Sequence, residues 1–254
     1  MSELIVETAG KVVIVTVDRP PVNALTIALY GEIADTFDAI GVRDDVHCAI
    51  LTARGARAFC AGLDVKEFLA ATPEQDSERA KIVRRTFSAV RHCAIPVIAA
   101  VNGPALGAGC VLASVCDIRL AAPNAIFGLP EINVGRCGGG AHLGRHLPQG
   151  LLRRMYFTGK PIGADEAQRY GFVDDIVPMQ DLVSAAIRLA ETIAGKAPLG
   201  LRLGKKSLNE IEFMPVEAGY AREQEYSTQL MRTEDAREAT RAVVEKRAPV
   251  FKGR

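Results

Sequence analysis

The sequence predicts a mixed α/β protein in which strands and helices alternate up to about residue 150 and helices dominate afterwards. Short β-branched or apolar runs, as at 11–17, 47–52 and 96–101, alternate with helical patterns such as 26–40. The last two of these runs each lead into a glycine-rich turn. Beyond residue 150, apolar positions recur mostly at helical spacing, which completes the prediction.

Composition narrows the class of protein. The chain has 254 residues, of which 48% are hydrophobic and 24% charged, enough for one large domain or two small ones. With 31 basic and 30 acidic residues the net charge is +1, so neither nucleic acid nor a membrane surface is an expected partner. The N-terminus has no apolar leader and no run approaches the roughly 18 apolar residues of a membrane span, which predicts a cytoplasmic protein.

The six cysteines are scattered along the chain without a Cys-x-x-Cys pair. Most have apolar neighbours, and a chain of this length does not need disulfides to be stable. We therefore expect free, buried thiols rather than a disulfide framework or a zinc site.

The first half is expected to begin with a hairpin of strands 4–8 and 11–17, followed by an amphipathic helix over 26–40 and a strand over 47–52. The polar segment 72–80 is typical of a loop or an exposed helix start, and a helical pattern resumes over 81–93. The next elements in order are a strand at 96–101, a helix at 107–115 that is apolar all round, and strands at 117–122 and 125–128. Further helices are expected at 151–157, 164–170, 182–194, 200–210, 216–231 and 234–246.

Two turns stand out because each follows a buried strand and precedes a helical segment. They read Phe59-Cys60-Ala61-Gly62-Leu63-Asp64 and Asn102-Gly103-Pro104-Ala105-Leu106-Gly107-Ala108-Gly109-Cys110. A helix start exposes backbone N–H groups without partners, and small residues let a ligand approach them. Two such N–H groups converging from different segments would form an oxyanion hole. For Asp64 we favour helix capping over catalysis.

Five motifs in register resemble the enoyl-CoA hydratase/isomerase (crotonase) family over essentially the whole chain. The resemblance implies a spiral of repeated β-β-α units and a C-terminal helical region that mediates trimerisation, often into hexamers. It divides the chain into an acyl-CoA-binding core, 1–195, and a trimerisation region, 196–254. The motifs are the two turns (the second with the preceding strand 96–101), Cys116-Asp117-Ile118-Arg119-Leu120-Ala121, Phe127-Gly128-Leu129-Pro130-Glu131 and the C-terminal run 245–254.

Residue by residue, the resemblance implies that the backbone N–H groups of Leu63 and Ala108 bind a thioester oxygen. The second position is usually glycine in the family, so a methyl group borders the site here. The substrate is expected to contact residues around these donors as well, namely Ala61, Gly62, Asp64, Gly107 and Gly139.

The carboxylates bear on the reaction. Family hydratases commonly have a glutamate three residues beyond the second donor, where this chain has Val111. The second family glutamate is present as Glu131, which becomes the expected acid/base beside an oxyanion-stabilised enolate. One carboxylate favours double-bond isomerisation over ordinary 2-enoyl-CoA hydration. A specialised hydratase, a lyase, a C–C hydrolase and a catalytically silent acyl-CoA-binding trimer remain as alternatives.

The segment after Glu131 departs from the family pattern. It carries Arg136 and His142, which could line the acyl pocket or a phosphate channel. Lys66 and Lys252 are candidates for the CoA phosphates, with the C-terminal residue coming from the same or a neighbouring subunit. No metal or redox cofactor is expected, because neither GxGxxG after a strand nor a P-loop occurs; coenzyme A enters as part of the substrate.

Overall fold

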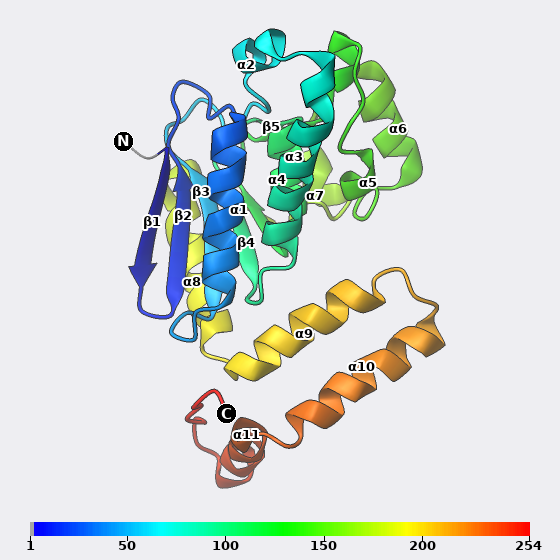
Figure 1. The fold of residues 1–254 in the computed structure, drawn as a ribbon. Coiled ribbons are helices and arrows are strands. Elements are labelled where there is room, and N and C mark those ends of the chain that lie inside the picture. Colours follow the sequence, from blue (N-terminus) through cyan, green and yellow to red (C-terminus); the bar gives the residue numbers. More distant parts are fainter. Residues whose placement is uncertain (1–2) are drawn as a thin grey trace.

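The computed structural model describes residues 3–254 and contains a six-stranded sheet at its centre (Figure 1). Its strands lie in the order β1 to β4, then β6 and β9, and all pairs are parallel except the β1–β2 hairpin. The predicted hairpin is therefore confirmed. The strands are β1 (Leu4–Ala9), β2 (Val12–Val17), β3 (Cys48–Ala53), β4 (Val97–Val101), β6 (Ile118–Ala121) and β9 (Asp175–Ile176).

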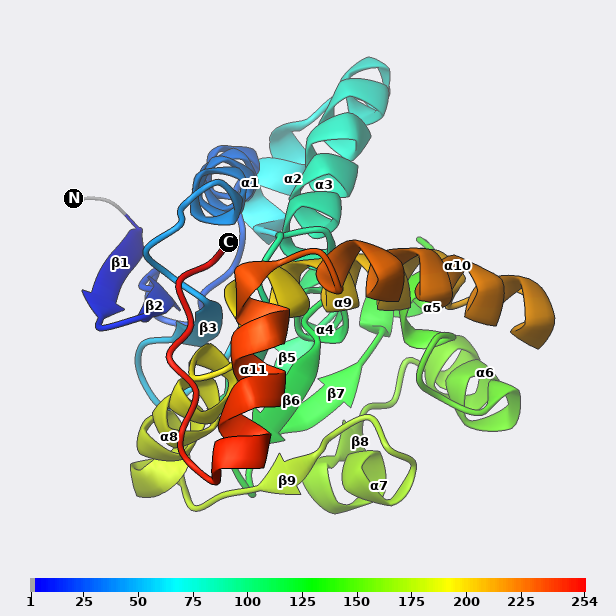
Figure 2. The same cartoon turned by 90° about the horizontal axis from the view of Figure 1, so that it is seen from below.

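Helices cover both faces of this sheet (Figures 1 and 2). Ala49 and Leu51 of β3 join a core with α1, α3 and α4, whereas Cys48 and Ile50 of the same strand pack toward α8. A strand buried on both faces carries apolar residues at successive positions, which explains the continuous apolar runs in the sequence. The helices are α1 (Ile27–Gly41), α3 (Asp76–Arg91), α4 (Ala108–Ser114) and α8 (Leu182–Ala194).

A smaller sheet lies beyond the ends of β3 and β4. Its three strands, β5 (Ala105–Leu106), β7 (Ile126–Gly128) and β8 (Ile162–Gly163), pair in that order. Short elements surround it, with α2 at the top of Figure 1. They are the helices α2 (Val65–Ala70), α5 (Gly140–Leu143), α6 (Gln149–Thr158) and α7 (Ala164–Arg169) and the 3-10 turns η1 (Pro73–Gln75), η2 (Pro130–Val134) and η3 (Met179–Asp181).

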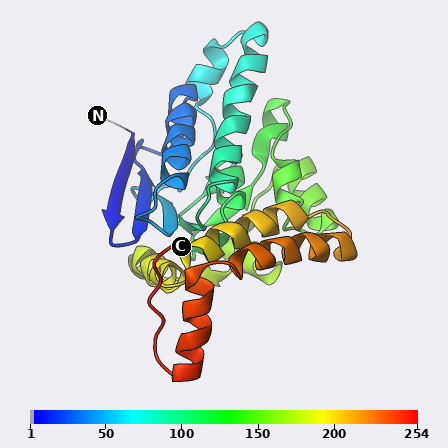
Figure 3. The same ribbon diagram turned by 60° about the horizontal axis from the view of Figure 1, so that its bottom comes forward.

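The last three helices are α9 (Pro198–Ile211), α10 (Val216–Leu230) and α11 (Glu234–Glu245). The first two lie side by side and antiparallel below the sheet, and α11 turns away from the body (Figures 1 and 3). Side chains of α9 fasten it to the core: Lys205 pairs with Asp117 at 2.7 Å, and the Asn209 amide donates to the Arg91 carbonyl at 3.0 Å.

Several sequence expectations needed correction. The two-residue strands β5, β8 and β9 were not predicted. Segment 72–80 is the exposed helix start that was one of the two expectations for it, with a 3-10 turn that runs directly into α3. The expectation of buried thiols is right for five cysteines and wrong for Cys137, which is exposed. All six thiols are free.

Candidate active site

The two turns meet because neighbouring parallel strands deliver them to the same edge of the sheet. Cys60 and Ala105 form an isolated parallel bridge between the turns. The Asn102 side-chain amide donates to the carbonyls of Ala53 and Gly55 at 2.8 and 2.6 Å. These contacts fix the end of β4 against the loop that follows β3.

The turns approach each other backbone to backbone. A Cβ placed on Gly109 would lie 2.1 Å from the Cys60 carbonyl oxygen, and one on Gly62 would lie 3.1 Å from the Leu106 carbonyl oxygen. Gly62 also has a φ of +101°, which L side chains rarely adopt. Contact therefore requires glycine at position 109, and the backbone conformation together with a tight contact favours glycine at position 62.

Two backbone N–H groups of the described residues have no hydrogen-bond acceptor where the turns meet. Asp64 N donates to the Leu25 carbonyl and Gly107 N to the Gly128 carbonyl, at 2.9 and 2.8 Å. Within residues 3–254, the N–H groups of Leu63 and Ala108 donate to no protein acceptor. Ala108 is the first residue of α4, where an N–H has no partner inside the helix. Donation to a thioester oxygen, as predicted from the sequence, requires this arrangement.

Glu131 lies next to the second turn. It is in the first turn of η2, and its Oε1 is 2.8 Å from the place that a Cβ on Gly107 would occupy. Its Oε2 is buried and has no hydrogen-bond partner among the described residues. Burial raises the pKa of the Glu131 carboxyl group above its usual range. The structure thus places a desolvated carboxylate beside the proposed oxyanion donors.

The position of the missing second carboxylate is apolar and filled. Val111 is 3% exposed. A Cβ on Gly139 would lie 2.8 Å from Val111 Cγ2 and 2.6 Å from Leu129 Cδ2. Gly139, with a φ of +76°, therefore closes on Val111 without leaving space for a methyl group.

Residues at the rim have other partners in this chain. Asp64 is the N-cap of α2, accepts from Glu67 N at 3.0 Å and pairs with Arg19 at 2.8 Å, so the capping prediction is confirmed. Ala61 lies beside it, with its N–H bonded to the Val22 carbonyl. Lys66 is exposed on α2.

Lys252 does not join the site within one chain. It is exposed, and its backbone N–H donates to Asp235 of α11 at 2.7 Å. This end of the chain lies at the opposite side of the molecule from α2 (Figures 1 and 3).

Arg136 and His142 occupy different environments. The Arg136 guanidinium pairs with Asp76 at 2.8 Å and lies 4.7 Å from the centre of the Phe68 ring, so it links the loop after Glu131 to the α2–α3 segment. The His142 ring is half-buried and packs edge-on against Phe87 at 5.5 Å. Burial and nearby arginines lower the pKa of His142, which keeps the ring neutral at physiological pH.

Sequence reasoning missed Tyr30. This residue belongs to the predicted helix 26–40, is 2% exposed, and has its pKa raised by burial and by the charges of Cys60 and Glu131. A phenol on the otherwise apolar face of that helix was the available signal. Tyr30 was not part of the apolar pattern that predicted the helix, and a tyrosine also suits a core position, so nothing in the sequence marked it as functional.

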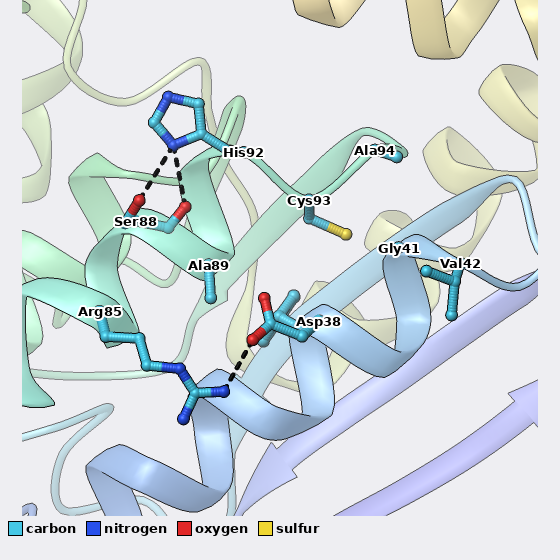
Figure 4. Close-up of a pocket in the computed structure, with 10 residues that line it drawn as sticks. Asp38, Gly41, Val42, Arg85, Ser88, Ala89, His92, Cys93 and Ala94 are labelled. Atoms are coloured by element: carbon cyan, nitrogen blue, oxygen red, sulfur yellow. Dashed lines mark hydrogen bonds and ion pairs between the residues drawn. The ribbon is translucent and has the colours of Figure 1, made fainter.

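A separate cavity of about 370 Å³ lies between the C-terminal parts of α1 and α3 (Figure 4). It is bordered by the Asp38–Arg85 ion pair and by His92, whose ring contacts Ser88. None of the predicted site residues lines it. Over residues 3–254, no group of three or more His, Cys, Asp or Glu side chains is placed to hold a metal ion, and no helix is long and apolar enough to cross a membrane.

Known proteins share both the sequence and the fold. The family model described as enoyl-CoA hydratase/isomerase matches residues 7–254. A 2,3-dehydroadipyl-CoA hydratase of Escherichia coli is 37% identical, and the match covers 100% of each chain. A (7aS)-7a-methyl-1,5-dioxo-2,3,5,6,7,7a-hexahydro-1H-indene-carboxyl-CoA hydrolase of Mycobacterium tuberculosis is 40% identical over 86% of this chain and 89% of its own length.

Among solved structures, an enoyl-CoA hydratase of Bacillus anthracis superposes with a TM-score of 0.96 at 34% identity, again over 100% of both chains. The predicted crotonase-type fold is therefore confirmed. The paired turns, the single carboxylate and these similarities together show that the chain belongs to the enoyl-CoA hydratase/isomerase family and acts on CoA thioesters.

Proposed function

We propose that this protein stabilises the enolate of an acyl-CoA thioester and moves protons on its acyl chain through Glu131. The N–H groups of Leu63 and Ala108 would donate to the thioester oxygen, where negative charge develops. The observation that carries the proposal is the Glu131 carboxylate, which has one buried, unpartnered oxygen and lies against the turn of the second donor. A desolvated carboxylate with a raised pKa is suited to accept and return a proton near neutral pH.

Double-bond isomerisation is the reaction that this arrangement favours. One carboxylate can take a proton from one acyl carbon and return it to another while the oxyanion hole holds the enolate. Val111 offers no second acid/base, and its packing against Gly139 leaves no space beside it for a group from that loop.

Carbon–carbon bond hydrolysis is the second candidate, favoured by the 40% identity to the M. tuberculosis protein named as a hydrolase. Hydration is named for the E. coli relative. All three reactions share the enolate and the Glu131 step. They differ in substrate, so a screen of several acyl-CoA substrates separates them.

The test is a turnover screen of wild type, Glu131→Ala and Glu131→Gln with 3-enoyl-CoA, 2-enoyl-CoA and cyclic oxo-acyl-CoA substrates. Loss of a general acid/base typically lowers the rate about 10²- to 10⁴-fold, and we expect a loss of this size with every accepted substrate. Glu191→Gln, an exposed change on α8, is the matched control and should leave turnover unchanged. Full turnover by Glu131→Ala would refute the proposal, and calorimetric binding of acyl-CoA by wild type without any turnover would favour a silent binding protein.

The raised pKa of Glu131 also predicts the pH dependence. Its basic form is lost as the pH falls through that raised value, so kcat/KM for proton abstraction should decline there with a slope of one proton. The free energy of unfolding depends on pH in the opposite direction from kcat/KM. The native state holds this proton more tightly than the unfolded chain, so the stability contribution of Glu131 falls as pH rises from about 4.5 to the raised pKa. Glu131→Gln should remove both effects, which pH-rate and pH-unfolding profiles measure.

Assembly and cofactor requirements complete the proposal. We infer a homotrimer, or a hexamer built from trimers, formed through the C-terminal helices, whose exposed apolar side chains support such a contact. Coenzyme A would enter with the substrate, its phosphates meeting Lys66 and Lys252 of a neighbouring subunit, and no other cofactor would be needed. The exposed apolar residues of this region include Leu208, Phe213, Met214, Val216, Tyr220, Met231, Val243 and Val244.

A further inference from the structure

Tyr30 projects from the helix that begins beside the first oxyanion turn. Leu25 forms a parallel bridge with Leu63, and α1 starts two residues later with Thr26 as its N-cap. Tyr30 follows after one turn of that helix and is 2% exposed, so its side chain is enclosed by the protein rather than by solvent. The Thr86 hydroxyl donates to the Tyr30 carbonyl at 2.8 Å and fixes this part of α1 against α3.

The phenol ring is held in place by an aromatic row. Its centroid lies 6.1 Å from that of Phe87, with the ring planes at 84°, and Phe87 in turn packs edge-on against His142. His142 belongs to α5, which directly follows the Gly139 contact with Val111. The row therefore runs from α1 through α3 to the segment that closes the apolar side of the site.

The hydroxyl group of Tyr30 has no protein partner in residues 3–254, although nearly the whole residue is buried. Four side-chain N or O atoms of the described residues are fully enclosed and have no hydrogen-bond partner, and the Tyr30 hydroxyl oxygen is not one of them. They are Arg91 Nε, Asn102 Oδ1, Glu131 Oε2 and Ser207 Oγ. Part of the small exposed area of Tyr30 is therefore at its hydroxyl. The Glu131 carboxylate belongs to the same region: a Cβ on Gly107 would lie 2.8 Å from Glu131 Oε1 and 3.9 Å from the Cα of Gly62, which precedes the Leu63 bridge to Leu25. The contribution of the Glu131 charge to the raised pKa of Tyr30 agrees with this placement.

A nearly buried hydroxyl without a protein partner gains a hydrogen bond when an oxygen atom binds beside it. Because the pKa of Tyr30 is raised, its hydroxyl keeps its proton at any physiological pH and can act as a donor. The side chain of Val111, at the second-carboxylate position, can form no hydrogen bond. The site therefore holds one charged side chain and one neutral side-chain donor.

We propose that Tyr30 is a further active-site residue whose hydroxyl donates a hydrogen bond to an oxygen atom facing Glu131, at or near acyl carbon 3. That oxygen belongs either to a water molecule or to a hydroxyl or oxo group on the acyl chain. The inference rests on the proposed function, because it places the acyl chain beside Glu131. It predicts that the site prefers acyl chains, or reactions, that bring such an oxygen.

The test compares wild type with Tyr30→Phe, which keeps the ring packed on Phe87 and removes only the oxygen. Tyr170→Phe, at an exposed tyrosine that directly follows α7, is the matched control. Calorimetry measures the affinity for 3-hydroxyhexanoyl-CoA and for hexanoyl-CoA. We expect Tyr30→Phe to bind the hydroxylated ligand about 5- to 10-fold more weakly, as for one lost hydrogen bond, and the saturated ligand unchanged.

A second assay follows hydration of 2-hexenoyl-CoA and isomerisation of 3-hexenoyl-CoA. Slower hydration with unchanged affinity for the hydroxylated ligand assigns the oxygen to water, and weaker affinity assigns it to the acyl chain. Equal effects on both ligands and both reactions, or no effect at all, would overturn the proposal.

Wild type alone provides a further check, because it should bind 3-hydroxyhexanoyl-CoA more tightly than hexanoyl-CoA. If Tyr30→Phe does not fold, equal wild-type affinity for the two ligands together with absent hydration overturns the proposal. The binding arm needs no turnover, so failure of Glu131 as the acid/base would leave the Tyr30 result readable.

Discussion

The oxyanion turns and the segments around the acyl pocket are held by different kinds of contact. The turns are fixed by backbone, with the Cys60 carbonyl so close to Gly109 that only a hydrogen fits between them. The acyl-side segments are joined by side chains at the surface, such as Arg136 with Asp76, where both partners are 40% or more exposed. The difference teaches that the turns proposed to bind the thioester are built into the fold, whereas under the same proposal the choice of acyl group would depend on individual side chains.

Gly109→Ala should break the backbone-held region and have the largest effect. Its Cβ would meet the Cys60 carbonyl oxygen at 2.1 Å and the Cys60 Cβ at 2.7 Å, so one of the two turns must move. We expect a loss of at least about 3 kcal/mol in the free energy of unfolding, measured by urea titration, together with loss of turnover. Gly204→Ala on α9, where nothing lies within 4 Å, is the control and should not destabilise the protein.

Ala108→Pro sharpens the same comparison by removing one N–H and little else. Proline suits the first position of a helix, and the preceding Gly107 tolerates unusual backbone angles. Loss of one oxyanion donor costs about 2.7–4 kcal/mol of barrier, so we expect kcat to fall about 10²- to 10³-fold while the fold is retained. Turnover within threefold of wild type, in a protein with an unchanged melting temperature, would remove Ala108 from the oxyanion hole.

Arg136→Ala tests the side-chain-held region and should have the smallest effect. Exposed ion pairs contribute about 0–1 kcal/mol, and the stacking on Phe68 adds a similar amount. We expect unfolding to change by less than about 1.5 kcal/mol and kcat to stay within a few-fold, with the difference appearing in KM and varying among acyl chains. A uniform loss of kcat with all substrates would instead place Arg136 in the chemistry.

The same contrast explains how much could be predicted from sequence. The glycines of the two turns predicted exposed backbone N–H groups, and the resemblance to the family pointed to those of Leu63 and Ala108. Neither N–H donates to a protein acceptor in residues 3–254. Strands β3 and β4 were found because burial on both faces makes them continuously apolar.

The features that were not predicted from the sequence all depend on contacts between distant parts of the chain. Strands β5, β8 and β9 have two residues each and pair only through long-range contacts, so they leave no periodic pattern. Cys137 is exposed because it lies in an irregular glycine-rich loop, where no pattern relates sequence to burial. The contact of Tyr30 with Phe87 depends on tertiary packing of α1 against α3, and local sequence carries no information on it.

The contact between Val111 and Gly139 has a consequence for how such enzymes diverge. A glutamate at position 111 would need the volume that Leu129 and the Gly139 backbone now occupy, so gaining it demands a shift of the loop at the same time. A change from a one-carboxylate to a two-carboxylate site is then an epistatic step rather than a single substitution. A library that varies positions 111 and 129 together, so that a smaller residue can replace Leu129, is expected to contain active solutions that position 111 alone cannot reach.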